Sequence, residues 1–200
     1  MTRDQSLEAL MATARAEFLR YGFDGTDVNR IARRSGLAPT SFYRWFKDKT
    51  DIFVAVYRRW EAEEQQAMRR LMARSGSLAT LVEACIDHHR AHTLFRRSLR
   101  RLGHEDARVR QALASSRLER LASLGLWMGG PHASDSELAA DLLLFEGLAI
   151  VLAEADLGGM GLDDKAARRQ LSVILARWRA QPVRAANDPV AESLRGAGPV

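Results

Sequence analysis

The chain has 200 residues, of which 46% are hydrophobic and 28% charged, the proportions of a globular protein that buries a sizeable core. Lysine and arginine total 30 against 25 for aspartate and glutamate, which permits a polyanionic partner without requiring one. The single cysteine, Cys85, excludes an intrachain disulfide and favours a reducing compartment. The N-terminus has no apolar signal segment, and Asp141 and Glu146 interrupt the most apolar stretch, so we expect a cytoplasmic protein without a membrane span.

Apolar residues recur with the 3.6-residue period of an α-helix, and no run alternates as a strand would. Leu7, Met11, Ala14 and Phe18 keep this spacing in a first helix that ends at Tyr21. The sequence therefore predicts an all-α protein of about nine helices. In chain order, the further helices are expected at about residues 28–35, 39–46, 49–75, 78–92, 94–102, 105–128, 135–156 and 163–181.

Glycine-rich segments and caps set the expected boundaries of these helices. Gly103 should end the helix at 94–102, residues 158–161 should form a connector, and Ser134 with Glu137 has the spacing of a capping box. We expect two domains and a tail that is largely disordered. The expected ranges are an N-terminal domain at 4–64, a second helical domain at 65–181 and a tail at 182–200.

Two short helices joined by a glycine-containing turn, at about residues 27–46, have the form of a helix-turn-helix. Asp27 is placed to cap the first helix, Gly36 to adopt the turn conformation, and Pro39 to open the second helix. Asp48 is placed to cap the long helix that follows at 49–75. Burial of Phe42 and Phe46 would leave the other face of the second helix outward. The outward side chains are Thr40, Ser41, Tyr43 and Arg44.

Positive charge is concentrated in this segment. Between residues 26 and 49 there are six cations and two anions, a local charge of +4, which is typical of phosphate binding. A solvated helix face is the alternative for the arginines, and Trp45 suits packing as well as it suits DNA contact. The cations are Arg30, Arg33, Arg34, Arg44, Lys47 and Lys49, and the anions are Asp27 and Asp48.

The segment resembles the DNA-binding domain of TetR-family transcriptional regulators. The resemblance is carried by Gly22, residues 26–32 (TDVNRIA), Gly36-Leu37, residues 40–46 (TSFYRWF) and Lys49. It covers about the first quarter of the chain and implies a homodimeric, all-helical repressor that a small molecule releases from its double-stranded DNA operator. Ala38 departs from the family's usual capping serine, at a cost of about 1 kcal/mol to that helix.

Carried over position by position, the resemblance implies two kinds of DNA contact. Tyr43 and Lys49 should contact phosphates. The residues expected at or near base edges and backbone are Asn29, Arg30, Ala38, Pro39, Thr40, Ser41 and Arg44.

The second domain should hold the ligand, because the first three helices are committed to DNA and the last to pairing. One interior helix face is expected from residues spaced by four, three and four, namely Leu81, Cys85, His88 and His92. We expect an apolar or aromatic ligand with one or two polar functions, anionic if Arg96 or Arg100 turns inward. The candidate pocket residues are Cys85, His88, His89, His92, Phe95, Trp127, Met128 and Phe145.

Metal ions and cofactors are not expected. His88 and His92 share a helix face, but one helix alone cannot surround a metal ion. Arg96, Arg97, Arg100 and Arg101 form a second basic cluster, for which a solvated face, an anion site and an electrostatic extension toward DNA all remain open.

The helix at 138–153 is apolar on two faces, so its second face must be buried against something. It is either an internal core helix or, as the resemblance implies, part of a four-helix dimer interface with the last helix. The expected interface residues are Leu142, Phe145, Leu148, Leu152, Leu171, Ile174 and Trp178.

Two other classes of protein compete with a regulator. An enzyme is disfavoured because the Gly-x-Ser-x-Gly, His-Glu-x-x-His and dinucleotide-binding motifs are absent from the sequence. A helical scaffold that binds protein would make the basic segment incidental. Retention on DNA or heparin that falls steeply with salt distinguishes a regulator from both.

Overall fold

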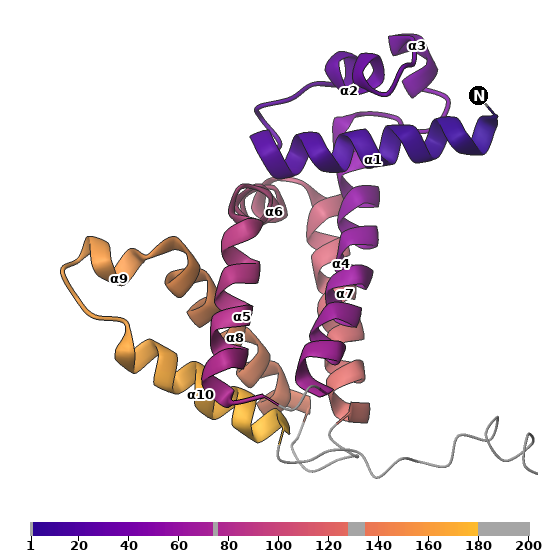
Figure 1. Ribbon diagram of the computed structural model, residues 1–200. Coiled ribbons are helices and arrows are strands. Elements are labelled where there is room, and N and C mark those ends of the chain that lie inside the picture. Colours follow the sequence, from indigo (N-terminus) through magenta and orange to yellow (C-terminus); the bar gives the residue numbers. More distant parts are fainter. Residues whose placement is uncertain (1, 74–75, 128–134, 180–200) are drawn as a thin grey trace, which may run out of the picture.

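The computed structural model describes residues 2–73, 76–127 and 135–179, and within these ranges the protein contains ten helices and no strand (Figure 1). The all-α prediction is therefore confirmed. The helices are α1 (Arg3–Tyr21), α2 (Val28–Arg34), α3 (Pro39–Phe42), α4 (Lys49–Ala73), α5 (Leu78–Ala91), α6 (Thr93–Glu105), α7 (Ala107–Trp127), α8 (Asp135–Glu154), α9 (Asp156–Gly159) and α10 (Lys165–Arg179).

Local signals fix the ends of the early helices. The Asp27 side chain accepts a hydrogen bond from the Arg30 backbone N–H at 2.8 Å and caps α2, while Gly36 has φ +77° in the turn. Before α4, the Asp48 side chain accepts from the Asp51 N–H at 2.8 Å. These expected caps are confirmed.

Helix α3 is shorter than the sequence predicted. It ends at Phe42 rather than near Phe46, and the chain continues in tight turns in which Arg44 N–H and Trp45 N–H donate to carbonyls three residues back. Ala38 supplies no side-chain cap, so α3 lacks one stabilising bond at its start. The turns still bury Phe42 and Phe46 on the same side.

Two predicted boundaries in the second half are wrong. Gly103 lies inside α6, which continues to Glu105. A Cβ atom at position 103 would come within 2.8 Å of Leu113 Cδ1 on α7. Gly103 therefore permits close helix packing and does not end the helix. The expected connector at 158–161 is partly the short helix α9, which follows Ala155 in the left-handed conformation. Ser134 of the predicted capping box and the tail at 182–200 lie outside the described residues.

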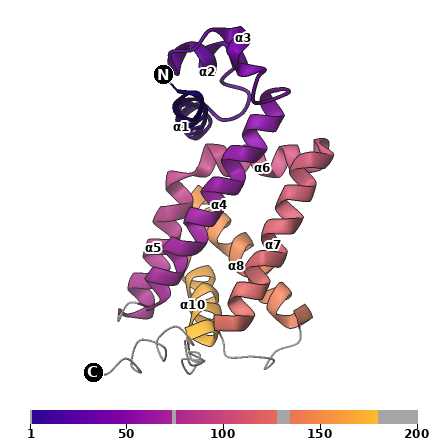
Figure 2. The same cartoon turned by 90° about the vertical axis from the view of Figure 1, so that its right-hand side faces the viewer.

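Helices α1 to α3 form one end of the molecule, and α4 runs from them down its length beside α7 (Figures 1 and 2). Helix α6 lies crosswise beneath α1, which it contacts, and α8 and α10 pack together and against α5. None of the described helices is long and apolar enough to cross a membrane.

The buried apolar residues form two clusters. One joins α1 to α3 and the first half of α4 with Phe95, Leu99 and Leu102 of α6. The other joins the end of α4 with α5, α8 and α10. By its apolar packing α6 thus lies with the N-terminal helices, although the predicted domain boundary at 64/65 places it in the second domain.

Candidate functional site

The helix-turn-helix presents a polar face at the end of the molecule. Tyr43 is 62% exposed, and Asn29, Ala38, Thr40 and Arg44 are also exposed. Pro39 and Ser41, the other two carried-over residues of α3, are half-buried. These side chains can reach a partner without rearrangement of the core.

Two exposed cations extend this face beyond the residues carried over from the family. Arg33 and Lys47 are exposed, and no carboxylate pairs with either among the described residues. Their charge, already counted in the +4 of the segment, was the signal that could have placed them in the predicted site.

Arg30 has an internal partner. Glu17 of α1 is only 2% exposed, and its carboxylate accepts from the Thr26 hydroxyl at 2.9 Å while pairing with Arg30 at 2.7 Å and Arg34 at 3.0 Å. The Arg30 guanidinium also stacks over Tyr21 at 4.3 Å. Arg30 therefore ties α2 to α1, and part of the basic charge of α2 is neutralised within the protein.

Lys49 also has an internal role. Its Nζ donates to the carbonyl oxygens of Phe23 at 2.9 Å and Thr26 at 3.1 Å, and lies 4.0 Å from the centre of the Phe23 ring. Partial burial lowers the pKa of Lys49. Lys49 therefore connects the start of α4 to the α1–α2 loop. One of its three N–H donors remains for a phosphate. Trp45, half-buried beneath Arg3 at 4.9 Å, serves in packing.

Helix α6 connects the helix-turn-helix end to the interior of the second half. The Ser98 hydroxyl accepts from the Phe23 backbone N–H at 2.9 Å, and Arg101 pairs with Asp24 at 2.7 Å. Phe95, on the same helix, contacts Phe53 of α4 with ring centres 5.2 Å apart. A shift of α6 would therefore move the loop between α1 and α2.

Two adjoining cavities lie among α4 to α8 and α10. The α10-side cavity, of about 80 Å³, is mostly apolar and lined in part by Met68, Met72, Leu124, Leu142, Phe145 and Trp178. The α6-side cavity, of about 460 Å³, is lined in part by Tyr57, Trp60, Leu99, Arg100, Leu113 and Ile150. Both share a polar wall made of Glu61, His89, Arg96 and Arg120.

Ion pairs hold this polar wall in place. Arg120 of α7 donates to Glu61 from Nε at 3.1 Å and from Nη2, and to Glu146 from Nη1 at 2.7 Å. His89 Nδ1 lies 3.0 Å from the Cys85 carbonyl oxygen, and burial followed by the charge of Arg96 lowers the pKa of His89 to about 3. His89 is therefore neutral near pH 7.

The predicted pocket residues divide into three groups. His89 and Phe145 line a cavity, whereas Cys85, His88, His92 and Phe95 do not line either one. The side chain of Trp127 and all of Met128 lie outside the described residues.

The inward face of α5 differs from the predicted one. Leu81 and Cys85 of the predicted face are buried, but His88 and His92 are only half-buried. The other buried residues of the helix are Val82, Ile86 and His89. Burial raises the pKa of the Cys85 thiol to about 12, so it is protonated and inert at neutral pH. Glu61, Glu64 and Arg120, which sequence reasoning missed, reach the cavities from α4 and α7, and nothing in their spacing distinguishes them from surface charges.

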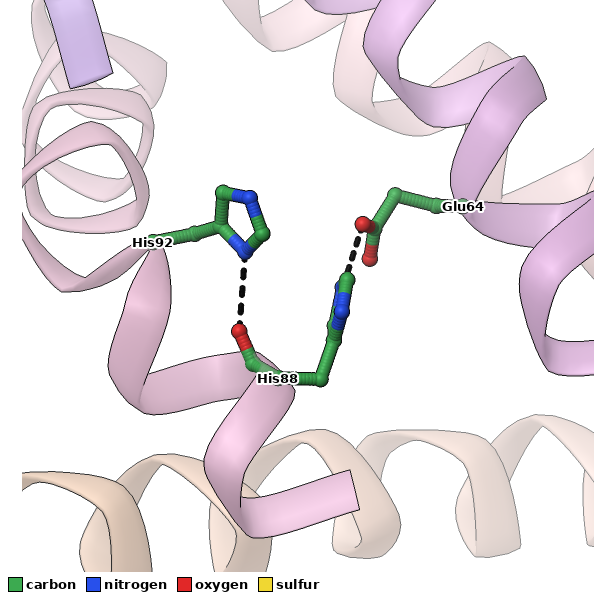
Figure 3. Close-up of side chains that lie close together, drawn as sticks. All are labelled: Glu64, His88 and His92. Carbon is green, nitrogen blue, oxygen red and sulfur yellow. Dashed lines mark hydrogen bonds and ion pairs between the residues drawn. The ribbon is translucent and has the colours of Figure 1, made fainter. Parts of the chain in front are cut away.

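His88 and His92 meet a third potential ligand, Glu64 of α4, as Figure 3 shows. Their ligand atoms all lie within 4.8 Å of one another, and His92 Nδ1 lies 2.8 Å from the His88 carbonyl oxygen. One Glu64 oxygen pairs with His88 Nε2, and the other pairs with Arg96 Nη2 at 2.9 Å. The guanidinium already neutralises the carboxylate and opposes a second cation beside it, so the cluster is best described as an ion-pair network between α4, α5 and α6.

The residues predicted for the dimer interface lie mostly inside the chain's own core. Six of the seven are no more than 5% exposed in the single chain, packed between α5, α8 and α10, and only Leu148 is half-buried. The large apolar side chains that remain exposed on these helices are Leu143 at 53%, Leu144 at 57% and Val173 at 50%.

Residues 10–56 match the family model for "Bacterial regulatory proteins, tetR family", which spans α1 to the start of α4. The sequence-based resemblance is thereby confirmed. No curated protein matches the chain by sequence.

Solved structures share the fold over nearly their whole length. A Mesorhizobium loti protein assigned to the TetR family of transcriptional regulators is 17% identical, with a TM-score of 0.62, covering 90% of this chain and 98% of that one. Salmonella enterica GusR is 18% identical, with a TM-score of 0.61 and the same coverage of both chains. Bacillus subtilis FadR, a transcriptional regulator solved with stearoyl-CoA, is 13% identical, with a TM-score of 0.50, covering 84% and 97%. All three likenesses are below 25% identity and show that the protein shares their fold.

Proposed function

We propose that this chain, which carries the TetR-family DNA-binding domain at residues 10–56, is a dimeric transcriptional repressor that a small molecule releases from its DNA operator. The observation that carries the proposal is that α6 packs against α1 at the helix-turn-helix end and also lines the α6-side cavity of about 460 Å³. Such a regulator acts on DNA in the cytoplasm and needs no covalent chemistry.

DNA recognition is assigned to the exposed face of α2 and α3. Thr40 and Ala38 are small enough to let α3 enter a major groove closely. Arg44 and Asn29 are exposed and able to reach base edges, while Tyr43 and the cations Arg33 and Lys47 are suited to phosphates. Arg30 and Lys49 support this face mainly by holding α2 and the α1–α2 loop in place.

The dimer is assigned to the outer faces of α8 and α10, using side chains other than those first predicted. Leu144 and Val173 are exposed there, and a side chain added at Gly147 would meet nothing within 4 Å. Two copies packed through this face would bury apolar surface that the single chain leaves in water. A two-fold dimer also presents two helix-turn-helix units to the two halves of an operator.

Release by ligand follows from the position of α6. A ligand in the α6-side cavity contacts Trp60, Leu99 and Arg100, and two of these lie on α6. The opposite face of α6 holds the α1–α2 loop through Ser98 and Arg101. A ligand that favours a shifted α6 would change the spacing of the two recognition helices in the dimer and weaken DNA binding.

The ligand is proposed to be largely apolar or aromatic with a few polar functions. The α10-side cavity supplies the apolar lining, and the shared wall supplies Glu61, His89 and Arg120. Bacillus subtilis FadR, a structural neighbour, was solved in complex with stearoyl-CoA, a ligand with a long apolar chain, which supports an apolar ligand here.

Selection of bound sequences from random DNA duplexes tests the proposed function. The full-length protein should enrich a pseudo-palindromic site, because a two-fold dimer reads two half-sites. Affinity for that site should fall with salt with a log–log slope of about −0.9 for each phosphate contact. Failure to enrich any sequence, with binding to DNA insensitive to salt, would contradict a repressor and favour a protein-binding scaffold.

A pair of variants tests the dimer face. Leu144→Glu should give monomers by sedimentation and lose DNA binding, because a charge in an apolar interface is left desolvated. Leu118→Glu, at a leucine of α7 that is 67% exposed, is the matched control and should remain dimeric. A Leu144→Glu protein that stays dimeric and binds DNA would remove this face from the interface.

A further inference from the structure

Two arginines of α6 line the α6-side cavity, and each has a donor that is not used inside the protein. Arg96 Nε and Arg100 Nη1 are buried and have no hydrogen-bond partner among the described residues. They are four residues apart, so they lie on the same face of the helix. A buried N–H group without a partner is costly, which favours an acceptor in the cavity beside them.

The remaining part of each guanidinium is already fixed. Arg96 Nη2 donates to Glu64 at 2.9 Å, and the group stacks over the Trp60 ring at 4.8 Å. Arg100 Nη2 donates to Glu154 at 2.8 Å. The two unused donors are therefore oriented before any ligand arrives, which lowers the entropy cost of binding.

The carboxylates that line the cavity do not accept hydrogen bonds from these two donors. Five arginines and two glutamates line it, and both glutamates are already engaged: Glu61 by Arg120, and Glu146 by Arg117 and Arg120. Arg110 Nη1 donates to two backbone carbonyl oxygens, that of His104 at 3.2 Å and that of Gly103 at 3.4 Å. An anionic ligand would thus enter an arginine-rich cavity whose acidic groups are already paired.

We infer that the α6-side cavity binds an organic carboxylate whose two oxygens accept from Arg96 and Arg100, with its apolar body against Trp60, Leu99 and Leu113. The inference rests on the proposed function, since it names the chemical class of the effector. A two-oxygen acceptor matches two donors on one helix face, and hydrogen bonds to a charged acceptor are the stronger kind. Glu61 Oε2, also buried without a partner, accepts from a hydroxyl or N–H elsewhere on the ligand.

Calorimetric titration of the full-length protein tests the carboxylate site. The probes are benzoate, phenylacetate and decanoate, each compared with its own methyl ester, which keeps the shape and removes the charge. At least one acid should bind about tenfold or more tightly than its ester, because only the acid supplies a charged acceptor to both arginines. Equal affinities for acid and ester, or no binding by any acid, would overturn the inference.

Arg100→Gln and Arg97→Gln form the matched pair of variants. Both arginines pair with Glu154, but Arg97 is exposed and does not line the cavity. Arg100→Gln should weaken the acid by about tenfold and leave the ester unchanged, whereas Arg97→Gln should bind both as the wild type does. An equal loss in the two variants would assign the effect to Glu154 and overturn the site.

Arg96→Lys keeps the charge and removes the Nε donor, so it tests the site if Arg100→Gln does not fold. It should also weaken acids relative to esters, and unchanged discrimination would count against the site. DNA binding of each variant without any probe is measured in parallel. If the wild type binds DNA in a salt-dependent way but does not distinguish acids from esters, the carboxylate site alone is rejected. If the wild type shows no salt-dependent DNA binding, the proposed function is rejected.

Discussion

The helix-turn-helix and the cavity region formed by α4 to α8 and α10 differ in how far along the chain their polar groups find partners. In the first, Asp27 caps a backbone group three residues away, and Thr26 reaches Glu17 across nine residues. In the second, Arg96 reaches Glu64 across 32 residues and Arg120 reaches Glu61 across 59. A sequence motif of fixed spacing can contain partners that lie a few residues apart. It cannot contain partners that lie tens of residues apart.

This difference explains which predictions succeeded. The family resemblance rests on residues whose neighbours are set by the local chain, and the family model matches the same segment. The cavity lining depends on four or more helices meeting, so its polar wall of Glu61 and Arg120 was not visible in the sequence. Four experiments sharpen the comparison, beginning with the residue that joins the two regions.

Phe53→Ala should have the largest effect. The Phe53 ring packs against Phe18 and Phe23 of the N-terminal region and against Phe95 of α6, with ring centres 5.0 to 5.2 Å apart. Truncation leaves a cavity at this junction, so the free energy of unfolding should fall by about 3–5 kcal/mol in urea titrations. Leu118→Ala on the surface of α7 is the control. A loss below about 1 kcal/mol in Phe53→Ala would mean that the two regions do not share this core.

His89 should make the second region sensitive to acid. Its pKa is about 3 in the folded protein against an ordinary 6.5, so between these pH values the unfolded chain takes up a proton that the folded chain refuses. The free energy of unfolding should therefore fall as pH drops below 6.5, by about 1.4 kcal/mol per pH unit from this group.

His89→Gln should remove that contribution, measured as a flatter dependence of stability on pH. His104→Gln changes an exposed histidine of α6 and is the control. The same slope in His89→Gln as in the wild type would show that His89 is not buried in the neutral form.

Ser98→Ala tests the connection between the regions with a smaller change. It leaves the buried Phe23 backbone N–H without its acceptor at 2.9 Å, at a cost of about 1–3 kcal/mol in stability. Ser115→Ala, at an exposed serine of α7, should cost little. If the two serine variants are equally stable in thermal unfolding, the contact between α6 and the α1–α2 loop contributes nothing measurable.

Arg44→Ala should have the smallest effect on folding, and its comparison with Arg30→Ala separates DNA contact from support. Arg44 is exposed and has no ion pair among the described residues, so its removal should weaken operator binding directly, measured by fluorescence anisotropy. If it contacts a phosphate, the salt slope falls by about 0.9. Arg30 pairs with Glu17, so Arg30→Ala should change the slope less. The reverse order would make Arg30 the DNA contact.

The sequence by itself determined the helical class, the caps at Asp27 and Asp48, and the family of the N-terminal domain. These follow from helix periodicity and from contacts within a few residues, which the order of side chains specifies directly. It did not determine the end of α3, because the buried pair Phe42 and Phe46 is compatible with either a helix or consecutive turns.

Only the tertiary structure decided which faces meet. Periodicity identified α8 and α10 as apolar, but not that Trp178 and its neighbours would be covered by the chain's own α5, which leaves Leu144 and Val173 exposed. The same holds for Gly103, whose role depends on Leu113 of the next helix. A helix pattern specifies that a face must be buried, whereas the partner that buries it is set by the packing of all the helices together.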